Sequence, residues 1–123
     1  NYQNVIDKQD NTSRRYRKMI RILKRMREAM KDAGYQTAHN AHSFLIESLL
    51  WNVPSDHYGN LLYEDDMTNV LNFLTYNLAT DERVGEWGEV NELKYLFGSH
   101  QKWSRVEAEA FVADAHSFMA DMS

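Results

Sequence analysis

The sequence predicts an all-α fold, a helical bundle of about four main helices with an irregular, glycine-containing connection before the last helix. Three observations favour this class. Apolar residues recur at intervals of three and four along several long stretches, a spacing that places them on one face of a helix. Those stretches contain neither glycine nor proline, which leaves helix formation uninterrupted. The last of them opens on a helix-capping motif.

The length of the chain suits a single domain, and its composition suits a soluble one. With 123 residues and a mass of 14.5 kDa, it is long enough for one core and too short to expect two. No apolar run is long enough to cross a bilayer, and cysteine is absent. Residues 1–12 are expected to be a flexible lead-in that lacks the layout of a secretory signal. These features favour a cytoplasmic protein with no membrane partner.

The charges are distributed unevenly along the chain. The first 33 residues contain ten Lys or Arg and four Asp or Glu, which gives +6. The remaining 90 residues contain four basic and 14 acidic residues, which gives −10. The N-terminal part of the domain therefore attracts anions and the rest repels them.

The first main helix is expected from an N-cap among residues 11–13 to Asp32, with Gly34 closing it. Its apolar face is formed by Tyr16, Met19, Leu23, Met26 and Met30. At about 100° per residue, the basic residues fall within an arc of roughly 140° on the opposite side. They are Arg14, Arg17, Lys18, Arg21, Lys24, Arg25 and Lys31. The helix thus has one buried stripe and one cationic stripe.

A polar connection is expected over residues 35–42, followed by a short helix from Ser43, as its N-cap, to Asn52. Pro54 then ends it. This helix is apolar nearly all round, which predicts a place in the middle of the core. Its apolar residues are Phe44, Leu45, Ile46, Leu49, Leu50 and Trp51.

A third helix is expected from Glu64 to Ala79. Acidic residues occupy its first turn, where the helix dipole favours them. The inner face is predicted to consist of Met67, Val70, Leu71, Leu74 and Leu78.

Residues 80–101 form the least regular stretch, because three glycines interrupt it around a short apolar piece at 93–97 that is long enough for one helical turn. The last helix begins with Ser104 and Glu107, which have the spacing of a capping box. Its buried face is predicted to consist of Ala108, Phe111, Ala115, Phe118 and Met122.

The cationic stripe is the strongest functional feature of the sequence. A solvated face is the usual explanation for charges opposite an apolar stripe. Here, however, Glu28 is the only acid between Asp10 and Asp32, so the like charges repel one another along the helix. A phosphate group would relieve that repulsion, either in a nucleoside triphosphate or in a nucleic-acid backbone.

Other candidate groups favour structural interpretations. His39 and His42 have a spacing that permits a shared metal, but without a cysteine or a third nearby histidine exposed loop residues explain them better. The pair Asp65 and Asp66 is explained by the helix dipole. Ser48 lacks a nucleophile elbow, and no glycine-rich phosphate loop is present. The sequence therefore predicts no catalytic residue and no metal ligand.

The three tryptophans are expected to be core anchors, although an aromatic residue at the mouth of a cleft can also stack on a nucleobase. They are Trp51, Trp87 and Trp103.

Three segments together resemble a known family: residues 17–25, the segment SFLIESLLWNVP at 43–54, and residues 87–97. They resemble the C-terminal half of bacterial nucleotidyltransferases related to cyclic GMP-AMP synthase and oligoadenylate synthetase, the enzymes of cyclic-oligonucleotide anti-phage signalling. The resemblance covers residues 14–118, and its middle segment is the most specific part.

The resemblance implies a nucleotide-binding lobe. In that family an N-terminal α/β lobe holds Mg²⁺ with an acidic triad, and the helical lobe closes the other side of the cleft. A basic residue on the long helix and a serine that opens the next helix hold the donor triphosphate, and the following aromatic stacks on its base. By position these roles fall to Lys18, Arg21 or Lys24, to Ser43 and to Phe44.

The chain departs from the complete enzyme because neither the Gly-Ser turn nor the acidic triad has a counterpart in it. The resemblance therefore implies a lobe that is inactive alone, with its own N-terminal catalytic lobe and ATP or GTP as partners, and Mg²⁺ expected only in the complete enzyme. The alternative is a non-enzymatic helical module that binds nucleic acid or an acidic partner through the first helix.

Overall fold

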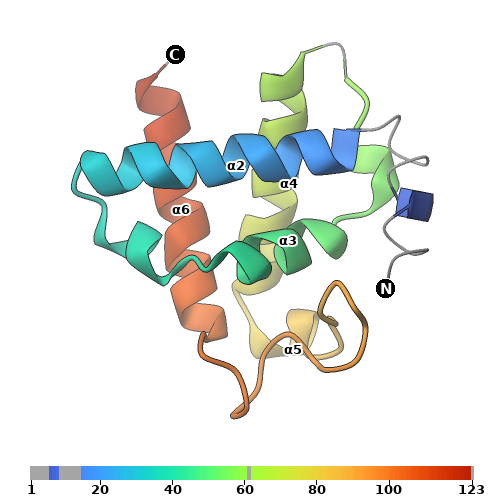
Figure 1. Cartoon of the computed structure of the whole chain (residues 1–123). Helices are drawn as coiled ribbons and strands as arrows, with labels where there is room; N and C mark the ends of the chain where they lie inside the picture. The colour runs from blue at the N-terminus through green and yellow to red at the C-terminus, as the bar shows by residue number, and fades with distance from the viewer. Residues whose placement is uncertain (1–5, 9–14, 61, 123) are drawn as a thin grey trace.

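The computed structural model describes residues 6–8, 15–60 and 62–122 (Figure 1). The N-cap expected among residues 11–13 lies outside the described residues. The main elements are α2 (Arg15–Asp32), η1 (Gln36–Asn40), α3 (Ser43–Trp51), η2 (Ser55–His57), α4 (Tyr63–Leu78), α5 (Asp81–Val84) and α6 (Arg105–Asp121). Across the described residues no strand forms, and one isolated bridge joins Gly88 to Tyr95. The all-α prediction is confirmed.

The helices are arranged as two crossed pairs. In Figure 1, α2 and α3 run side by side in opposite directions; α2 crosses in front of α4 and α6, α3 crosses in front of α4, and η1 lies against α6. The helices α4 and α6 pack against each other, also in opposite directions. The long connection from α4 to α6 lies at one end of the molecule, beyond α3. Within the described part of the chain, no helix combines the length and apolarity needed to cross a membrane.

The apolar stripe of α2 packs into the core as predicted. All five of its predicted residues are buried, and Ile20 joins them. The helix closes at Gly34, whose φ of +92° is a left-handed conformation that favours glycine. The following Tyr35 N–H donates to the carbonyl of Met30 (2.9 Å), the bond of a Schellman ending.

One prediction around the start of α3 is wrong. The polar connection expected over residues 35–42 contains the 3₁₀ helix η1, whose Ala38 is buried, as is the following Ala41. Ser43 is not the N-cap, because His42 occupies that position and no side-chain capping bond forms. The Ser43 hydroxyl accepts a hydrogen bond from α2 instead. Four of the six predicted apolar residues of α3 are buried, whereas Phe44 and Trp51 are half-buried, so one side of α3 packs in the core and the other faces outward.

The predicted inner face of α4 is buried throughout, and α6 begins with the predicted capping box of Ser104 and Glu107. On α6, Ala108, Phe111 and Ala115 are buried and Phe118 is half-buried. Met122 was expected on that face, but its side chain is 65% exposed. It is the C-cap residue, where the helix has passed the edge of the core.

The irregular connection contains the short helix α5, which the sequence analysis did not predict. Residues 93–97 form no helix. Instead Glu92 turns the chain with a φ of 61°, and Leu96 N–H donates to the carbonyl of Trp87 (2.8 Å). Trp103 is a core anchor as expected: it is buried and donates its Nε1–H to the carbonyl of Leu96 (2.8 Å). The other two tryptophans, Trp51 and Trp87, are half-buried.

Residues 6–8, part of the expected flexible lead-in, form a helical turn that places Lys8 against the end of α3. The ammonium group donates to the carbonyl of Val53 (2.6 Å). It also lies 5.6 to 5.8 Å from the ring centroids of Tyr16, Trp51 and Tyr58, within range for cation–π attraction. Burial lowers the pKa of Lys8 from 10.5 to about 8.

This pKa predicts that stability rises with pH in the alkaline range. Above pH 8 the folded chain releases the Lys8 proton while the unfolded chain still holds it, so the free energy of unfolding should rise by about 1 kcal/mol from pH 8 to 9.5. Burial raises the pKa of Tyr16 and of Tyr58, and these groups oppose the rise above about pH 10. Urea unfolding at several pH values measures the slope, which Lys8→Met should abolish. An equal slope in that variant would contradict the assignment.

Candidate functional site

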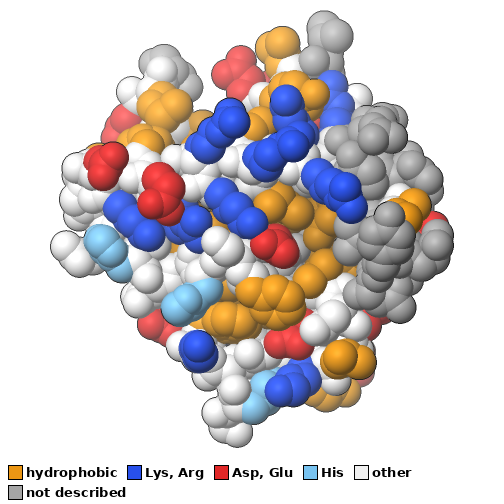
Figure 2. All heavy atoms as spheres, in the orientation of Figure 1, with side chains coloured by type: hydrophobic (Ala, Val, Ile, Leu, Met, Phe, Trp, Pro, Cys, Tyr) orange, Lys and Arg blue, Asp and Glu red, His pale blue; other side chains and the backbone are white. Residues whose placement is uncertain are grey.

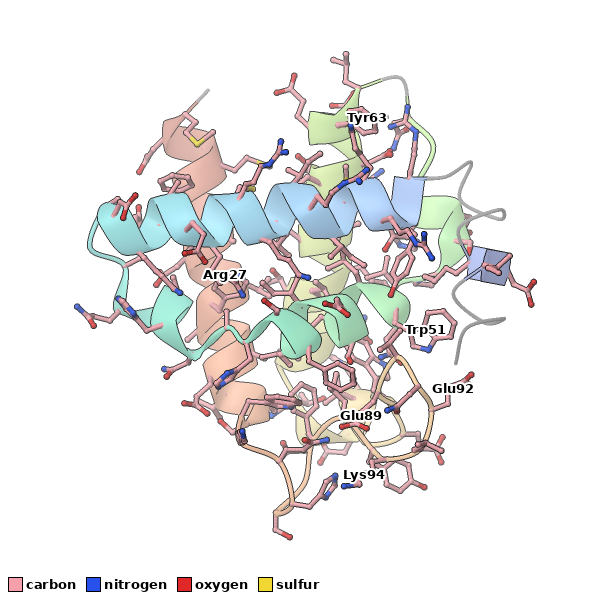
Figure 3. All side chains as sticks on the ribbon, in the orientation of Figure 1. Arg27, Trp51, Tyr63, Glu89, Glu92 and Lys94 are labelled. Atoms are coloured by element: carbon pink, nitrogen blue, oxygen red, sulfur yellow. The ribbon has the colours of Figure 1, made fainter. Side chains whose placement is uncertain are left out.

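The junction of α2 with the start of α3 brings basic side chains to Ser43. Arg27 donates one Nη1 group to the carbonyl of Ala41 (2.7 Å) and to the Ser43 hydroxyl (3.1 Å). Less than one turn earlier on α2, Lys24 contacts Glu47 of α3 (2.7 Å between Nζ and Oε2). Figure 3 shows Arg27 pointing from α2 toward the start of α3.

The pairing of α2 with α3 follows from their buried faces. Because the two helices run in opposite directions, the end of α2 lies beside the start of α3. Tyr16, near the other end of α2, donates its hydroxyl to the carbonyl of Glu47 (3.1 Å), and its ring contacts Trp51 edge to face. Apolar packing and these bonds determine which basic residues reach Ser43.

The cationic stripe is only partly neutralised. Figure 2 shows Lys and Arg side chains gathered over α2 with few acidic side chains among them. Glu47 supplies an acid from α3 that the sequence pattern of α2 did not reveal. Glu28 contacts both Arg27 and Lys31, and the hydrogen bond from Arg27 is the main cause that lowers its pKa. Among the described residues, no carboxylate pairs with Arg21.

A hollow of about 350 Å³ lies beside the junction, along the first two turns of α2. Arg17 and Arg21 of α2 line this hollow. Glu47 of α3 also lines it and contacts Lys24 at the junction. Tyr16, Ile20 and Val90 complete its lining. The combination of two guanidinium groups with an apolar lining suits a ligand that carries phosphate beside a less polar part.

Two of the predicted site residues open α3. Ser43 is exposed and Phe44 is half-buried. The ring of Phe44 lies 6.3 Å from that of Trp103, and the ring of His42 lies 5.7 Å from the same tryptophan. This aromatic group beside Ser43 leaves part of Phe44 accessible for stacking.

The five predicted site residues do not lie at one place. Ser43 and Phe44 open α3 and Lys24 contacts Glu47 one turn further along it, whereas Arg21 lines the neighbouring hollow. Lys18 lies nearer the start of α2, with its ammonium 5.7 Å from the ring centroid of Tyr63 at the start of α4. At 1.5 Å per residue, Lys18 and Lys24 are about 9 Å apart along the helix axis.

Arg27 contacts Ser43, although the sequence pattern did not point to it. It falls outside the arc that defined the cationic stripe. The spacing of Lys24, Arg27 and Lys31 at three and four residues would have placed it on a flank shared with two other cations.

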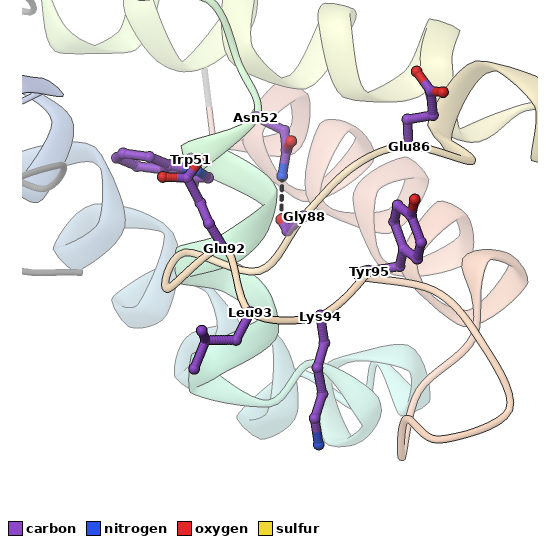
Figure 4. Close-up of a pocket in the computed structure, with 8 residues that line it drawn as sticks. All are labelled: Trp51, Asn52, Glu86, Gly88, Glu92, Leu93, Lys94 and Tyr95. Atoms are coloured by element: carbon purple, nitrogen blue, oxygen red, sulfur yellow. Dashed lines mark hydrogen bonds between the residues drawn. The ribbon is translucent and has the colours of Figure 1, made fainter.

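A larger hollow, of about 540 Å³, lies on the long connection and is less suited to an anion. Figure 4 shows it bordered by Glu86, Glu92, Lys94 and Tyr95, with the side chain of Asn52 donating to the carbonyl of Gly88 (2.8 Å). Two carboxylates against one ammonium give it a negative balance, so it does not complement a phosphate.

The residues that could ligate a metal do not gather. Within the described ranges, no three His, Asp or Glu side chains lie close enough to hold an ion. Asp66 faces Arg15 rather than Asp65. The donor groups of the described residues therefore offer no cluster for the Mg²⁺ ions that the family resemblance implies for the complete enzyme.

Fold and surface together define a helical domain whose first long helix is cationic and carries Arg27 against the Ser43 hydroxyl. Residues 3–120 match the family of cGAS/DncV-like nucleotidyltransferase C-terminal helical domains. The chain belongs to this family, and the resemblance inferred from the sequence is confirmed.

Similar proteins are synthases of cyclic dinucleotides. The cyclic dipyrimidine nucleotide synthase CdnE of Legionella pneumophila is 35% identical over 119 residues, which are 97% of this chain and 39% of that protein. A solved structure of Elizabethkingia meningoseptica CdnE cyclic dinucleotide synthase with GTP and Apcpp is 28% identical with a TM-score of 0.86, over 96% of this chain and 42% of that one. The Rhodothermus marinus CdnE c-UMP-AMP synthase, solved with Apcpp and Upnpp, has a TM-score of 0.79 at 28% identity, over 98% of this chain and 38% of that one. The chain thus spans about two fifths of the length of these relatives.

Proposed function

We propose that this domain binds the triphosphate of an ATP or GTP molecule at the junction of α2 with α3, as the helical lobe of a cyclic-dinucleotide synthase. Its relatives carry that activity in their names, and two of them are solved with nucleotides or their analogues. A role in anti-phage signalling in the cytoplasm is part of the same proposal.

The observation that carries the proposal is the contact between Arg27 and Ser43 beside Lys24. A guanidinium, an ammonium and a hydroxyl on two helices form a set of donors that suits the oxygens of a triphosphate. Glu47 holds Lys24 at 2.7 Å, an arrangement that keeps the ammonium at the junction until a more highly charged anion competes for it.

In this proposal the domain binds and orients, and the bond-making groups come from the other lobe. Lys24 and Arg27 hold the phosphates, Ser43 fixes one oxygen by a hydrogen bond, and the half-buried Phe44 offers its ring to the base. Holding the phosphate chain in place lowers the entropic cost of the attack on the α-phosphate.

Alanine substitution of Lys24 or Arg27 in the two-lobed protein tests the proposal. Each loses a charge-assisted bond to phosphate, so the affinity for a non-hydrolysable ATP or GTP analogue should fall about tenfold. Isothermal titration calorimetry measures it. The matched control is Lys102→Ala, because Lys102 is exposed on the connection before α6. This variant should bind the nucleotide analogue like the unmodified protein. Unchanged affinity in both α2 variants would refute the site.

A further variant, Lys18→Ala, distinguishes a triphosphate site from a nucleic-acid surface. Binding along a phosphate backbone involves many cations and weakens steeply with salt. A triphosphate at the junction uses two or three cations, so Lys18→Ala should have little effect. A large loss of binding affinity in Lys18→Ala, together with steep salt dependence of RNA or DNA binding, would favour the non-enzymatic alternative.

A further inference from the structure

A second surface lies on the side of α2 that faces α4 and α6. A hollow of about 220 Å³ opens where α2, the start of α4 and the end of α6 converge. Its lining is formed by Ile22, Met26, Tyr63, Glu64, Met67, Met119 and Met122. We call it the methionine pocket, because it contains four of the six methionines of the chain.

The methionine pocket is apolar and open to solvent. Met67 is buried at its floor, whereas Met122 is 65% exposed, Tyr63 is 43% exposed and the neighbouring Leu62 is 50% exposed. Exposed apolar residues that adjoin a hollow and have a charged rim are typical of protein interaction sites. Methionine suits such a site because its flexible, polarizable side chain adapts to different apolar partners.

The rim of the methionine pocket is charged differently on its two sides. Lys18, Ile22 and Arg25 are spaced four and three residues apart, so the two cations flank Ile22 on one face of α2. Among the described residues, neither cation pairs with a carboxylate, although Lys18 lies over the ring of Tyr63. On the opposite side Glu64, in the first turn of α4, supplies a carboxylate.

This surface is separate from the α2–α3 junction. Ile22 and Met26 line the methionine pocket, whereas Lys24 and Arg27 point to α3. A ligand at one surface therefore leaves the other accessible.

We propose that the methionine pocket is the docking site for an amphipathic helix of a partner protein, which inserts apolar side chains and lays an acidic flank along Lys18 and Arg25. The mode is a helix in an apolar groove, in which anchors at positions i, i+3 or i+4 and i+7 enter the hollow. Charge complementarity sets the direction of the helix, because Glu64 repels the acidic flank and accepts a basic one. The volume of the pocket admits a leucine or methionine side chain.

A peptide titration of the two-lobed protein, labelled with ¹³C in its methionine methyl groups, tests the proposal. The probe is a synthetic helical peptide of about 16 residues with leucines at the anchor positions, glutamates on one flank and lysines on the other. We expect the methyl signals of Met26, Met67, Met119 and Met122 to shift. Met19 and Met30, fully buried in the core, are the internal controls and should not move.

Two surface variants complete the test. Met122→Glu should weaken peptide binding about tenfold, because it places a charge at the apolar mouth. Arg25→Glu should weaken it about fivefold by repelling the acidic flank, whereas Lys102→Glu, the same change of charge sign on the connection, should not. Both variants change exposed residues, so the fold should be retained.

Several outcomes would overturn the inference. One is that the four methionine signals do not move when the peptide is added. Another is that they move equally with a peptide that has glutamates on both flanks and no leucine anchors. Shifts that depend on protein concentration without peptide would assign the pocket to a second copy of the chain. Binding that persists unchanged in Met122→Glu would place the peptide elsewhere.

Discussion

Replacing Asp66 with asparagine is expected to lower the free energy of unfolding by about 3 kcal/mol. The carboxylate is fully buried at the first turn of α4 and accepts hydrogen bonds from four groups. These are the N–H groups of Gly59 (3.0 Å) and Asn60 (2.7 Å), the side-chain amide of Asn60 (2.9 Å) and the guanidinium of Arg15 (2.8 Å). An amide would turn a donor toward these donors and leave Arg15 without its counterion.

The pKa of Asp66 gives the same prediction a pH dependence. Burial alone would raise the pKa, but the bonds from Gly59, Asn60 and Arg15 outweigh it and lower the pKa below 3.8. The carboxylate therefore stabilises the fold fully above the pKa of the unfolded chain, and this contribution disappears as pH falls through the lower folded value. The Asp66→Asn variant should lose this part of the acid dependence.

Urea unfolding followed by far-UV circular dichroism measures the effect, with Asp65→Asn as the matched control. Asp65 neighbours Asp66 in the same helical turn but is exposed, so its substitution should change the free energy of unfolding by less than about 0.5 kcal/mol. Similar losses in both variants would show that the charge of the first turn matters and the buried bonds do not.

Asp66 also shows where prediction from the sequence stops. The helix and its acidic first turn were predictable from periodicity and the helix dipole, and both are present. The burial of one of three consecutive acids was not. It depends on the turn at Gly59, whose φ of +104° brings two N–H groups toward the carboxylate, and on Arg15, 51 residues away.

The candidate site was likewise predictable in part from the sequence and in part only from the structure. Periodicity placed Lys24 and Arg21 on an exposed face of α2, and the family resemblance pointed to Ser43 and Phe44. The contact of Arg27 with Ser43 depends on the position of α2 along α3, and the packing of the two helices determines that position. Local patterns describe each helix alone, so they leave that register undetermined.

Truncating Leu49 to alanine is expected to lower the free energy of unfolding by about 3 to 4 kcal/mol. Leu49 lies on α3, is fully buried and belongs to the central apolar cluster. Because the Leu49 side chain is fully buried among close-packed neighbours, these neighbours fill the space only in part, and the loss includes a cavity term in addition to the transfer of the removed atoms.

The matched control is Leu93→Ala, which removes the same atoms from a side chain that is 81% exposed and should cost less than about 0.5 kcal/mol. Urea unfolding midpoints of the two variants provide the comparison. Because α3 carries both Ser43 and Glu47, a cavity beneath it should also loosen the junction with α2, and nucleotide affinity in the two-lobed protein should fall with Leu49→Ala but not with Leu93→Ala. Equal stability losses in the two variants would contradict the burial of Leu49 in the core, and a stability loss without an affinity loss would separate α3 from the proposed nucleotide site.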